Sequence, residues 1–285
     1  MEKKTVVRDL ITGEDRPLAG LRGFSAENCR FEGRGGSGYA LKDAGNGTVK
    51  GCLFAMPYPL WHAAGVTLLN SRLTEDAKDP FWYCEDLKIG KTFLHAGRGC
   101  RECRGVVLSE CDVSGNDFGW RCADVTVGKN SRIRSDRALF ESTNVRMRDT
   151  NLNGDDALQY VRDGEIIGCV VNANDFLWRA ENVTLTDCVI NGDRIGWYSE
   201  NLRFVRCRIA GNMPFCFCGG LVLEDCSMEG CESAFEHSSV EAMISGSIGS
   251  VRNPAHGSIS ADDIGSVVID GNRLPGSDCA IRTKR

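Results

Sequence analysis

The feature that most constrains this chain is a repeat of 19 residues. The segment Asn182–Gly192 aligns with Asn201–Gly211, so that Cys188 and Cys207 occupy the same position of the repeat. Stepping along the chain near this offset gives a column of mostly small side chains: Cys29, Cys52, Ser71, Thr92, Cys111, Asn130, Thr150, Cys169, Cys188, Cys207, Cys226 and Ser245. A nearly constant offset indicates a solenoid, in which each coil contacts only its neighbours.

Residues that tolerate a left-handed backbone recur just before the first expected strand of each coil. They are Asn46, Gly65, Asp86, Gly105, Asp124, Asn144, Asp163, Asn182, Asn201, Gly220, Ser239 and Ser258. A second set, including Asn191-Gly192 and Ala210-Gly211, follows the second expected strand. Gly, Asn and Asp reach positive φ at the least steric cost. The two sets therefore predict sharp corners at fixed positions of the coil.

Between the corners the apolar residues alternate, which is the period of a β-strand. Examples within one coil are Val183 and Leu185, Cys188 and Ile190, and Ile195 and Trp197. Only a parallel ladder keeps the same coil position directly above itself in every turn, and parallel crossovers are right-handed. The sequence therefore predicts an all-β fold, a right-handed parallel β-helix of about 12 coils, each with roughly 19 residues and three short strands.

No Pro/Ser-rich linker or charge run divides the 285 residues, which predicts a single domain. We expect an N-terminal cap over residues 1–23, regular coils over 24–245, and irregular C-terminal coils with a cap over 246–285. The net charge is -5 and acids and bases are interspersed, so nucleic acid is not an expected partner. The first residues contain no apolar stretch suited to a signal peptide or membrane helix, which predicts a cytoplasmic protein without a membrane partner.

Fifteen cysteines would suggest disulfides in a small secreted protein, but neither condition fits this chain. Their positions in the repeat favour a ladder of free thiols that pack as small apolar side chains. A redox or metal role is the alternative. The only C-x-x-C, from Cys100 to Cys103, lacks a second pair at zinc-site spacing, so no metal and no cofactor are expected.

Several motifs resemble those of the bacterial domain-of-unknown-function family 3737. They are Gly38-Tyr39-Ala40-Leu41-Lys42, Tyr58-Pro59-Leu60-Trp61, Gly196-Trp197-Tyr198-Ser199-Glu200-Asn201-Leu202, Phe215-Cys216-Phe217-Cys218, Ala234-Phe235-Glu236-His237-Ser238 and Asn253-Pro254-Ala255-His256-Gly257. They occur in the same order over nearly the whole chain. The resemblance implies a single-domain right-handed β-helix of pectin-lyase-like architecture, and it implies no activity or catalytic residue.

All five tryptophans fall in one column of the repeat: Trp61, Trp82, Trp120, Trp178 and Trp197. The column continues through Phe140 and Phe235 and is interrupted by Arg101, Gln159 and Cys216. Alternation with small neighbours favours tryptophans that point into the core. Arg101 and Gln159 would be costly in a dry interior, which favours the alternative of an exposed stripe for sugar rings. Trp120, Trp178 and Trp197 are then candidate ligand-binding residues.

Acidic residues and asparagines collect just after the second expected strand. They are Asn116, Asp117, Asp136, Asp155, Asp156, Asn174, Asp175 and Asp193, with Arg137 and Arg194 beside them. Such residues favour tight turns, and this is the simpler interpretation. The alternative is a catalytic stripe in which Asp155, Asp156 and Asp175 act as acid and base and Asp193 and Arg194 contact the ligand.

Two functions therefore remain open. The first is a non-catalytic scaffold or binding protein that presents one face to a carbohydrate or a protein partner. The alternative is a glycoside hydrolase or polysaccharide-lyase-like enzyme that uses the aspartates. The sequence leaves the oligomeric state open.

Overall fold

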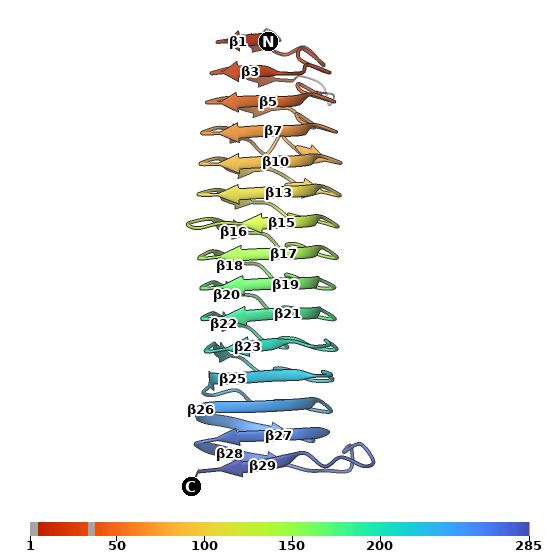
Figure 1. The fold of residues 1–285 in the computed structure, drawn as a ribbon, viewed down its shortest axis with the longest axis vertical. Coiled ribbons are helices and arrows are strands. Elements are labelled where there is room, and N and C mark those ends of the chain that lie inside the picture. The colour runs from red at the N-terminus through yellow and green to blue at the C-terminus, as the bar shows by residue number, and fades with distance from the viewer. Residues whose placement is uncertain (1–4, 34–37, 285) are drawn as a thin grey trace. The chain divides into compact units, whose positions relative to one another are not determined.

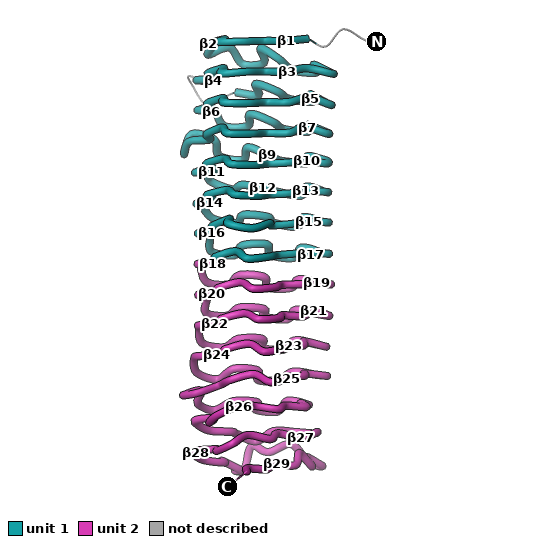
Figure 2. Tube along the Cα trace, turned by 60° about the vertical axis from the view of Figure 1, so that its left-hand side comes forward, with its two compact units in different colours: residues 1–151 teal, residues 152–285 magenta. Residues whose placement is uncertain are grey.

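A computed structural model describes residues 5–33 and 38–284 of the chain. It contains two compact units, Met1–Asn151 and Leu152–Arg285, which Figure 2 colours teal and magenta. Each unit is a right-handed parallel β-helix in which every coil is hydrogen-bonded to the next. The fold class predicted from the repeat is confirmed. Within the described ranges, no helix is long and apolar enough to span a membrane.

Unit 1 has two long parallel ladders. The first consists of β1 (Thr5–Arg8), β3 (Phe24–Glu27), β5 (Gly45–Lys50), β7 (Ala64–Leu69), β10 (Glu85–Gly90), β13 (Arg104–Ser109), β15 (Ala123–Val127) and β17 (Thr143–Arg148). The second consists of β2 (Ile11–Thr12), β4 (Arg30–Glu32), β6 (Leu53–Ala55), β8 (Arg72–Leu73), β11 (Phe93–His95), β14 (Asp112–Ser114) and β16 (Arg132–Arg134). The strand β18 (Asn151–Asn153) contains the division between the units.

Unit 2 repeats the arrangement, and Figure 1 shows its strands in succession. Its first ladder consists of β19 (Arg162–Ile167), β21 (Glu181–Thr186), β23 (Arg203–Val205), β25 (Leu221–Met228), β26 (Ser239–Arg252), β27 (His256–Ala261) and β29 (Ala280–Thr283). Its second ladder contains β20 (Val170–Asn172), β22 (Val189–Asn191), β24 (Arg208–Ala210), the end of β25, the end of β26 and β28 (Asp263–Val268).

The strand register confirms the 19-residue offset. Leu185 pairs with Phe204, and Ile190 pairs with Ile209. The coil count is about fourteen, slightly above the dozen predicted, because β1 and the strands after Ser245 also belong to parallel ladders.

The predicted corners have left-handed backbone. Asp163, Asn182 and Asn201 have φ between 55° and 59°. The side-chain amide of Asn182 donates to Asp163 Oδ1 at 3.1 Å, and that of Asn201 donates to Asn182 Oδ1 at the same distance. The corner residues thus also form a side-chain ladder of their own, which ties successive coils together.

The third side of most coils is a turn segment rather than a strand. The only strands found there in the described residues are β9 (Phe81–Trp82) and β12 (Cys100–Arg101), which pair in unit 1. In unit 2, Asp175, Leu177 and Arg179 have φ of 53°, 60° and 52°, so alternate residues of this segment are left-handed. Such a backbone is not extended and cannot belong to a regular strand.

Both interiors are filled by Phe, Leu, Ile, Val and small side chains, and no tryptophan is buried in the part of the chain that the structure describes. The predicted small column lies inside. Two of its members differ from the alignment, because Ser131 takes the place expected for Asn130, and Ile244 takes the place expected for Ser245. The column residues bond to the backbone of the adjacent coils, as the Cys207 thiol does to Leu185 O at 3.5 Å.

Candidate functional site

The tryptophans lie at the surface and are half-buried, so their expected inward orientation is wrong. The coil around Trp178 shows the cause. Phe176 and Leu177 are adjacent and both buried, Arg179 is exposed, and Ala180 is buried again. Because alternate residues of this segment are left-handed, its side chains do not alternate between inside and outside as they would in a strand, which the predicted orientation assumed. The Trp178 indole therefore lies at the surface, between the buried residues Leu177 and Ala180.

In unit 2 the surface rings form a continuous group, here called the C-terminal aromatic strip: Trp178, Trp197, Tyr198, Phe217 and His237. The rings of Trp178 and Trp197 stack with centroids 5.3 Å apart, and those of Tyr198 and Phe217 stack at 4.7 Å and 7°. Phe217 also meets His237 edge to face at 5.4 Å. The strip crosses successive coils, and Tyr198 is its most exposed member.

Stacking along the coils covers one face of each ring in the pairs Trp178–Trp197 and Tyr198–Phe217. The centroid separation of Trp178 and Trp197 is close to the rise between parallel strands, so each indole shields the face of the next. The Trp197 indole N–H is also engaged, since it donates to Met213 O at 2.6 Å. Arg179 adds a cation 5.5 Å from the Tyr198 ring centroid. The strip therefore presents a phenol beside a guanidinium, and each stacked pair has lost the open faces between its two rings.

Unit 1 carries a second group, the N-terminal aromatic strip: Tyr39, Tyr58, Trp61, Trp82 and Tyr83. Tyr39 stacks on Trp61 at 5.2 Å, and Trp61 stacks on Trp82 at 5.5 Å. Lys42 and Arg101 place their charges 5.0 Å and 4.7 Å from the rings of Trp61 and Trp82. This strip is thus a stack of aromatic rings with cations in contact with it.

A carboxylate fixes one end of the N-terminal strip. The Trp82 indole N–H donates to Glu102 at 3.0 Å. The hydrogen bonds that Glu102 receives from Trp82 and from the Tyr83 hydroxyl lower the pKa of Glu102, and the same carboxylate raises the pKa of Tyr83. Glu102 is therefore an ionised hydrogen-bond acceptor that orients two rings.

The surface position of the column also accounts for its polar members. Arg101 and Gln159 are half-buried at the surface rather than in a dry interior. Trp120 stacks with Phe140 at 4.6 Å in unit 1. Phe235 does not continue the column, because it stacks on Phe215 inside unit 2 and is fully buried.

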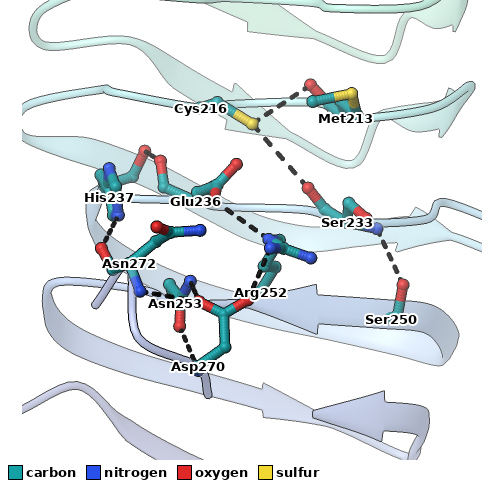
Figure 3. Close-up of polar contacts among 11 residues, drawn as sticks. Met213, Cys216, Ser233, Glu236, His237, Ser250, Arg252, Asn253, Asp270 and Asn272 are labelled. Carbon is teal, nitrogen blue, oxygen red and sulfur yellow. Dashed lines mark hydrogen bonds and ion pairs between the residues drawn. The ribbon is translucent and has the colours of Figure 1, made fainter. Parts of the chain in front are cut away.

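The C-terminal aromatic strip ends at a polar network, shown in Figure 3. Arg252 contacts Glu236 at 3.0 Å and Asp270 at 2.5 Å. Asn253 donates to Asp270 at 2.8 Å, while His237 Nε2 lies 2.7 Å from Asn272 O. The bond from Asn253 is the largest cause that lowers the pKa of Asp270, followed by the Asn272 amide and, more weakly, the Arg252 charge. An ionised, paired carboxylate of this kind holds the loop after β28 in place and is poorly suited to act as a general acid.

The aspartate candidates of unit 2 gather beside Arg194. Arg194 donates to both oxygens of Asp175, at 2.6 and 2.5 Å, and this bond is the main cause that raises the pKa of Arg194. Asp193 and Asp155 lie near enough to add smaller contributions. The structure thus brings Asp155, Asp175, Asp193 and Arg194 together, as the stripe predicted.

These carboxylates bond mainly to backbone and to neighbouring side chains. Asp155 accepts the Asn174 N–H at 2.9 Å, and Asp193 accepts the Asn212 N–H at 2.7 Å. Asp156 accepts from the Gln159 amide at 2.8 Å. Each of these side chains therefore has a role in the turns, which is the simpler of the two interpretations of the stripe.

The cysteines are free thiols, and all but Cys279 are buried. Burial raises the pKa of Cys216 and of Cys218 to about 12, so both stay protonated at neutral pH. Among the described residues, no group of three or more His, Cys, Asp or Glu side chains has the geometry of a metal site.

Residues 5–282 match the sequence profile of a family described as protein of unknown function (DUF3737). This chain belongs to that family. No match to the chain was found among curated proteins.

Several solved structures resemble this family member. They include PfbA, a surface adhesin of Streptococcus pneumoniae, with 11% identity over 87% of this chain and 71% of that chain, at a TM-score of 0.38. HetL, a pentapeptide repeat protein from Nostoc, is 13% identical over 77% of this chain and 91% of its own, at 0.32. The catalytic domain of a GH87 α-1,3-glucanase is 12% identical over 99% of this chain and 58% of its own, at 0.28. At these identities and TM-scores the similarities do not bear on function.

Sequence reasoning on this family member missed two features of its surface. One is the second aromatic column, in which Tyr198, Phe217 and His237 follow the tryptophan column by one residue. The other is the network around Arg252 and Asp270. Adjacent apolar pairs before the column, such as Phe176-Leu177, are the signal that could have revealed the outward tryptophans.

Proposed function

We propose that this DUF3737 member is a non-catalytic binding protein that contacts a protein partner through the C-terminal aromatic strip. The observation that carries the proposal is the surface position of the strip, in which Tyr198 is 40% exposed and Arg179 lies over its ring. Trp, Tyr and Arg are the residue types that dominate the binding energy of protein interfaces. Tyr198 also lies outside the hydrophobic core, so packing alone does not explain it.

A carbohydrate ligand for this strip is the second candidate. Sugar rings bind aromatic side chains through open ring faces. In the strip the faces of Trp178 and Trp197 are stacked on each other, and those of Tyr198 and Phe217 are stacked likewise. An exposed phenol beside a guanidinium suits a protein surface better.

The engagement of the aspartates supports a non-catalytic function. A general acid must be protonated and free to reach its substrate, whereas Asp175 is ion-paired to Arg194 and Asp155 accepts a backbone amide. The cytoplasmic location, and the absence of nucleic-acid and membrane partners, stay predictions from the sequence.

The test is site-specific photo-crosslinking. A photoreactive phenylalanine analogue replaces Tyr198 in the native cells, and the crosslinked protein is identified by mass spectrometry. The affinity of the purified partner for the full chain is then measured by calorimetry. We expect Tyr198→Ala to weaken binding at least tenfold, or about 1.4 kcal/mol, because the side chain is central to the contact.

The matched control is Val170, an exposed residue of β20 on another side of the coil. The analogue at this position should not yield the same product, and Val170→Ala should bind normally. Equal affinity of the Tyr198→Ala variant would contradict the proposal. An oligosaccharide array in which binding disappears with Tyr198→Ala would assign the strip to a carbohydrate instead.

A further inference from the structure

A second surface of unit 1 places cationic and apolar side chains in alternation on the second ladder. Arg30 pairs with Leu53, Leu53 with Arg72, and Arg72 with Phe93. All four side chains occupy outward positions of β4, β6, β8 and β11. Because neighbouring parallel strands lie about 4.8 Å apart, Arg72 and Phe93 stand side by side at that spacing.

The four residues line an open groove of about 610 Å³, together with Asn70 and Lys91. The described lining includes three cations and no carboxylate. Arg30 is held by Glu32 at 2.6 Å, and Lys91 lies 3.8 Å from Glu110. Arg72 differs, since it has no ion pair or side-chain hydrogen bond within the part of the chain that the structure describes. Elsewhere on the second ladder, an ion pair across coils neutralises an arginine, as between Arg134 and Asp112 at 2.7 Å.

Phe93 is the aromatic side chain of this groove. It is 52% exposed, and it makes an edge-to-face contact with His95, whose ring centroid lies 6.0 Å away. Its neighbours on the ladder are Arg72 and Asp112, neither of which is aromatic. In contrast to the tryptophans, Phe93 is therefore not stacked on another ring of the described chain.

We infer that this groove binds a sugar ring that carries an anionic group. The apolar CH face of the sugar packs on Phe93, and the anionic group reaches Arg72 on the neighbouring strand, where a guanidinium can pair with it through two hydrogen bonds. The rise of about 4.8 Å between the two strands is close to the width of one sugar ring. Asn70 and Lys91 supply further donors for hydroxyl groups and negative charge.

The test compares matched ligands by NMR titration of the full chain. Methyl β-D-glucuronide should bind at least tenfold more tightly than methyl β-D-glucoside, which differs only in the charged group. Glucose 6-phosphate against glucose forms the second pair and decides between a carboxylate and a phosphate as the anionic group. Raising the salt concentration should weaken both charged ligands, because the contact with Arg72 is exposed to solvent.

Variants then separate the two contacts. Phe93→Ala and Arg72→Gln should each reduce affinity for the preferred charged ligand at least tenfold, and Arg72→Lys should reduce it less because a point charge remains. Both positions are exposed, so circular dichroism should show an unchanged fold. The control is Val107→Ala, an exposed position of β13 on the first ladder of the same unit, and it should bind like the unaltered chain.

Three outcomes would overturn the inference. Equal binding of the charged and neutral sugars would leave only apolar contact. Equal competition by inorganic phosphate would mean a general anion site without sugar recognition. Absence of binding by all four ligands would leave Phe93 and Arg72 without this role, while the aromatic strip of unit 2 would be unaffected.

Discussion

The small residues inside the coils share one task, which is to connect the backbones of adjacent coils. Ser199 is fully buried, accepts the Ala180 N–H at 2.9 Å and donates to Leu177 O at 2.6 Å. Cys218 donates to Gly196 O at 2.9 Å from the corresponding position of the next coil. Serine and cysteine therefore replace each other at this position of the coil because both are small and both can donate and accept.

This equivalence predicts how Ser199 responds to substitution. Ser199→Ala should lower the free energy of unfolding by about 1–3 kcal/mol, because a buried amide and a buried carbonyl lose a partner. Ser199→Cys should cost less, since a thiol makes the same contacts at Cys218. Urea unfolding followed by tryptophan fluorescence measures both variants. An alanine variant as stable as the parent would show that the hydroxyl bonds contribute nothing.

A pH effect is expected at Asp270. Its hydrogen bonds from Asn253 and Asn272 hold its pKa below the ordinary 3.8 in the folded state. Folding therefore favours the ionised form. The contribution of Asp270 to the free energy of unfolding is complete above about pH 4 and is lost as the pH falls through the lower folded pKa. Hydrogen exchange in the loop after β28, measured relative to the intrinsic rate at each pH, should accelerate over that range. The Asp270→Asn variant should exchange faster at neutral pH, and lowering the pH should cause no further acceleration that stems from this residue. A pH profile identical to that of the unaltered chain would contradict the assignment.

At the scale of the element, the sequence shows the strands and corners more clearly than the third side of the coil. A parallel ladder imposes the same constraint on every coil, so the 19-residue offset and the Asn, Asp and Gly corners recur visibly. The turn segment is different, because Leu177 and Arg179 adopt positive φ although their residue types give no such indication. The inward assignment of the tryptophans failed for this reason. The gathering of the aspartates could be predicted, since turn residues at one offset must stack, but their hydrogen-bond partners could not.

The corner after β24 provides a test of how tightly adjacent coils approach. A Cβ at Gly211 would lie 1.9 Å from Gly192 O, and φ there is 137°. Gly230 also has positive φ, at 75°, but a Cβ there would meet nothing within 4 Å. We expect Gly230→Ala to cost about 1–2 kcal/mol from backbone strain alone. Gly211→Ala should cost clearly more, because its φ is adopted almost only by glycine and because the backbone of the preceding coil must move. Thermal unfolding measures both; equal losses would mean that the close approach is relaxed in solution.

Over the whole molecule, fifteen cysteines without disulfides follow from the repeat rather than from redox chemistry. In the ladder of unit 2, the thiols of Cys188, Cys207 and Cys226 point to carbonyls of the preceding coil, namely Ile166 O, Leu185 O and Phe204 O. Burial keeps such thiols out of reach of solvent and of dissolved reagents. The chain can therefore carry many cysteines and still expose very little thiol reactivity.

This view predicts the thiol chemistry of the intact chain. In native buffer, an aromatic disulfide reagent should modify one thiol at most, that of Cys279, since the other fourteen are buried. Burial is the largest cause that raises the pKa of Cys279 above the ordinary 9.0, so its reaction rate should still be rising beyond pH 9. In urea without reductant, fifteen thiols should react, and Cys279→Ser should abolish the native reaction. Several fast thiols in the native chain would mean that the ladders are open to solvent, and fewer than fifteen in urea would mean that some of them are oxidised.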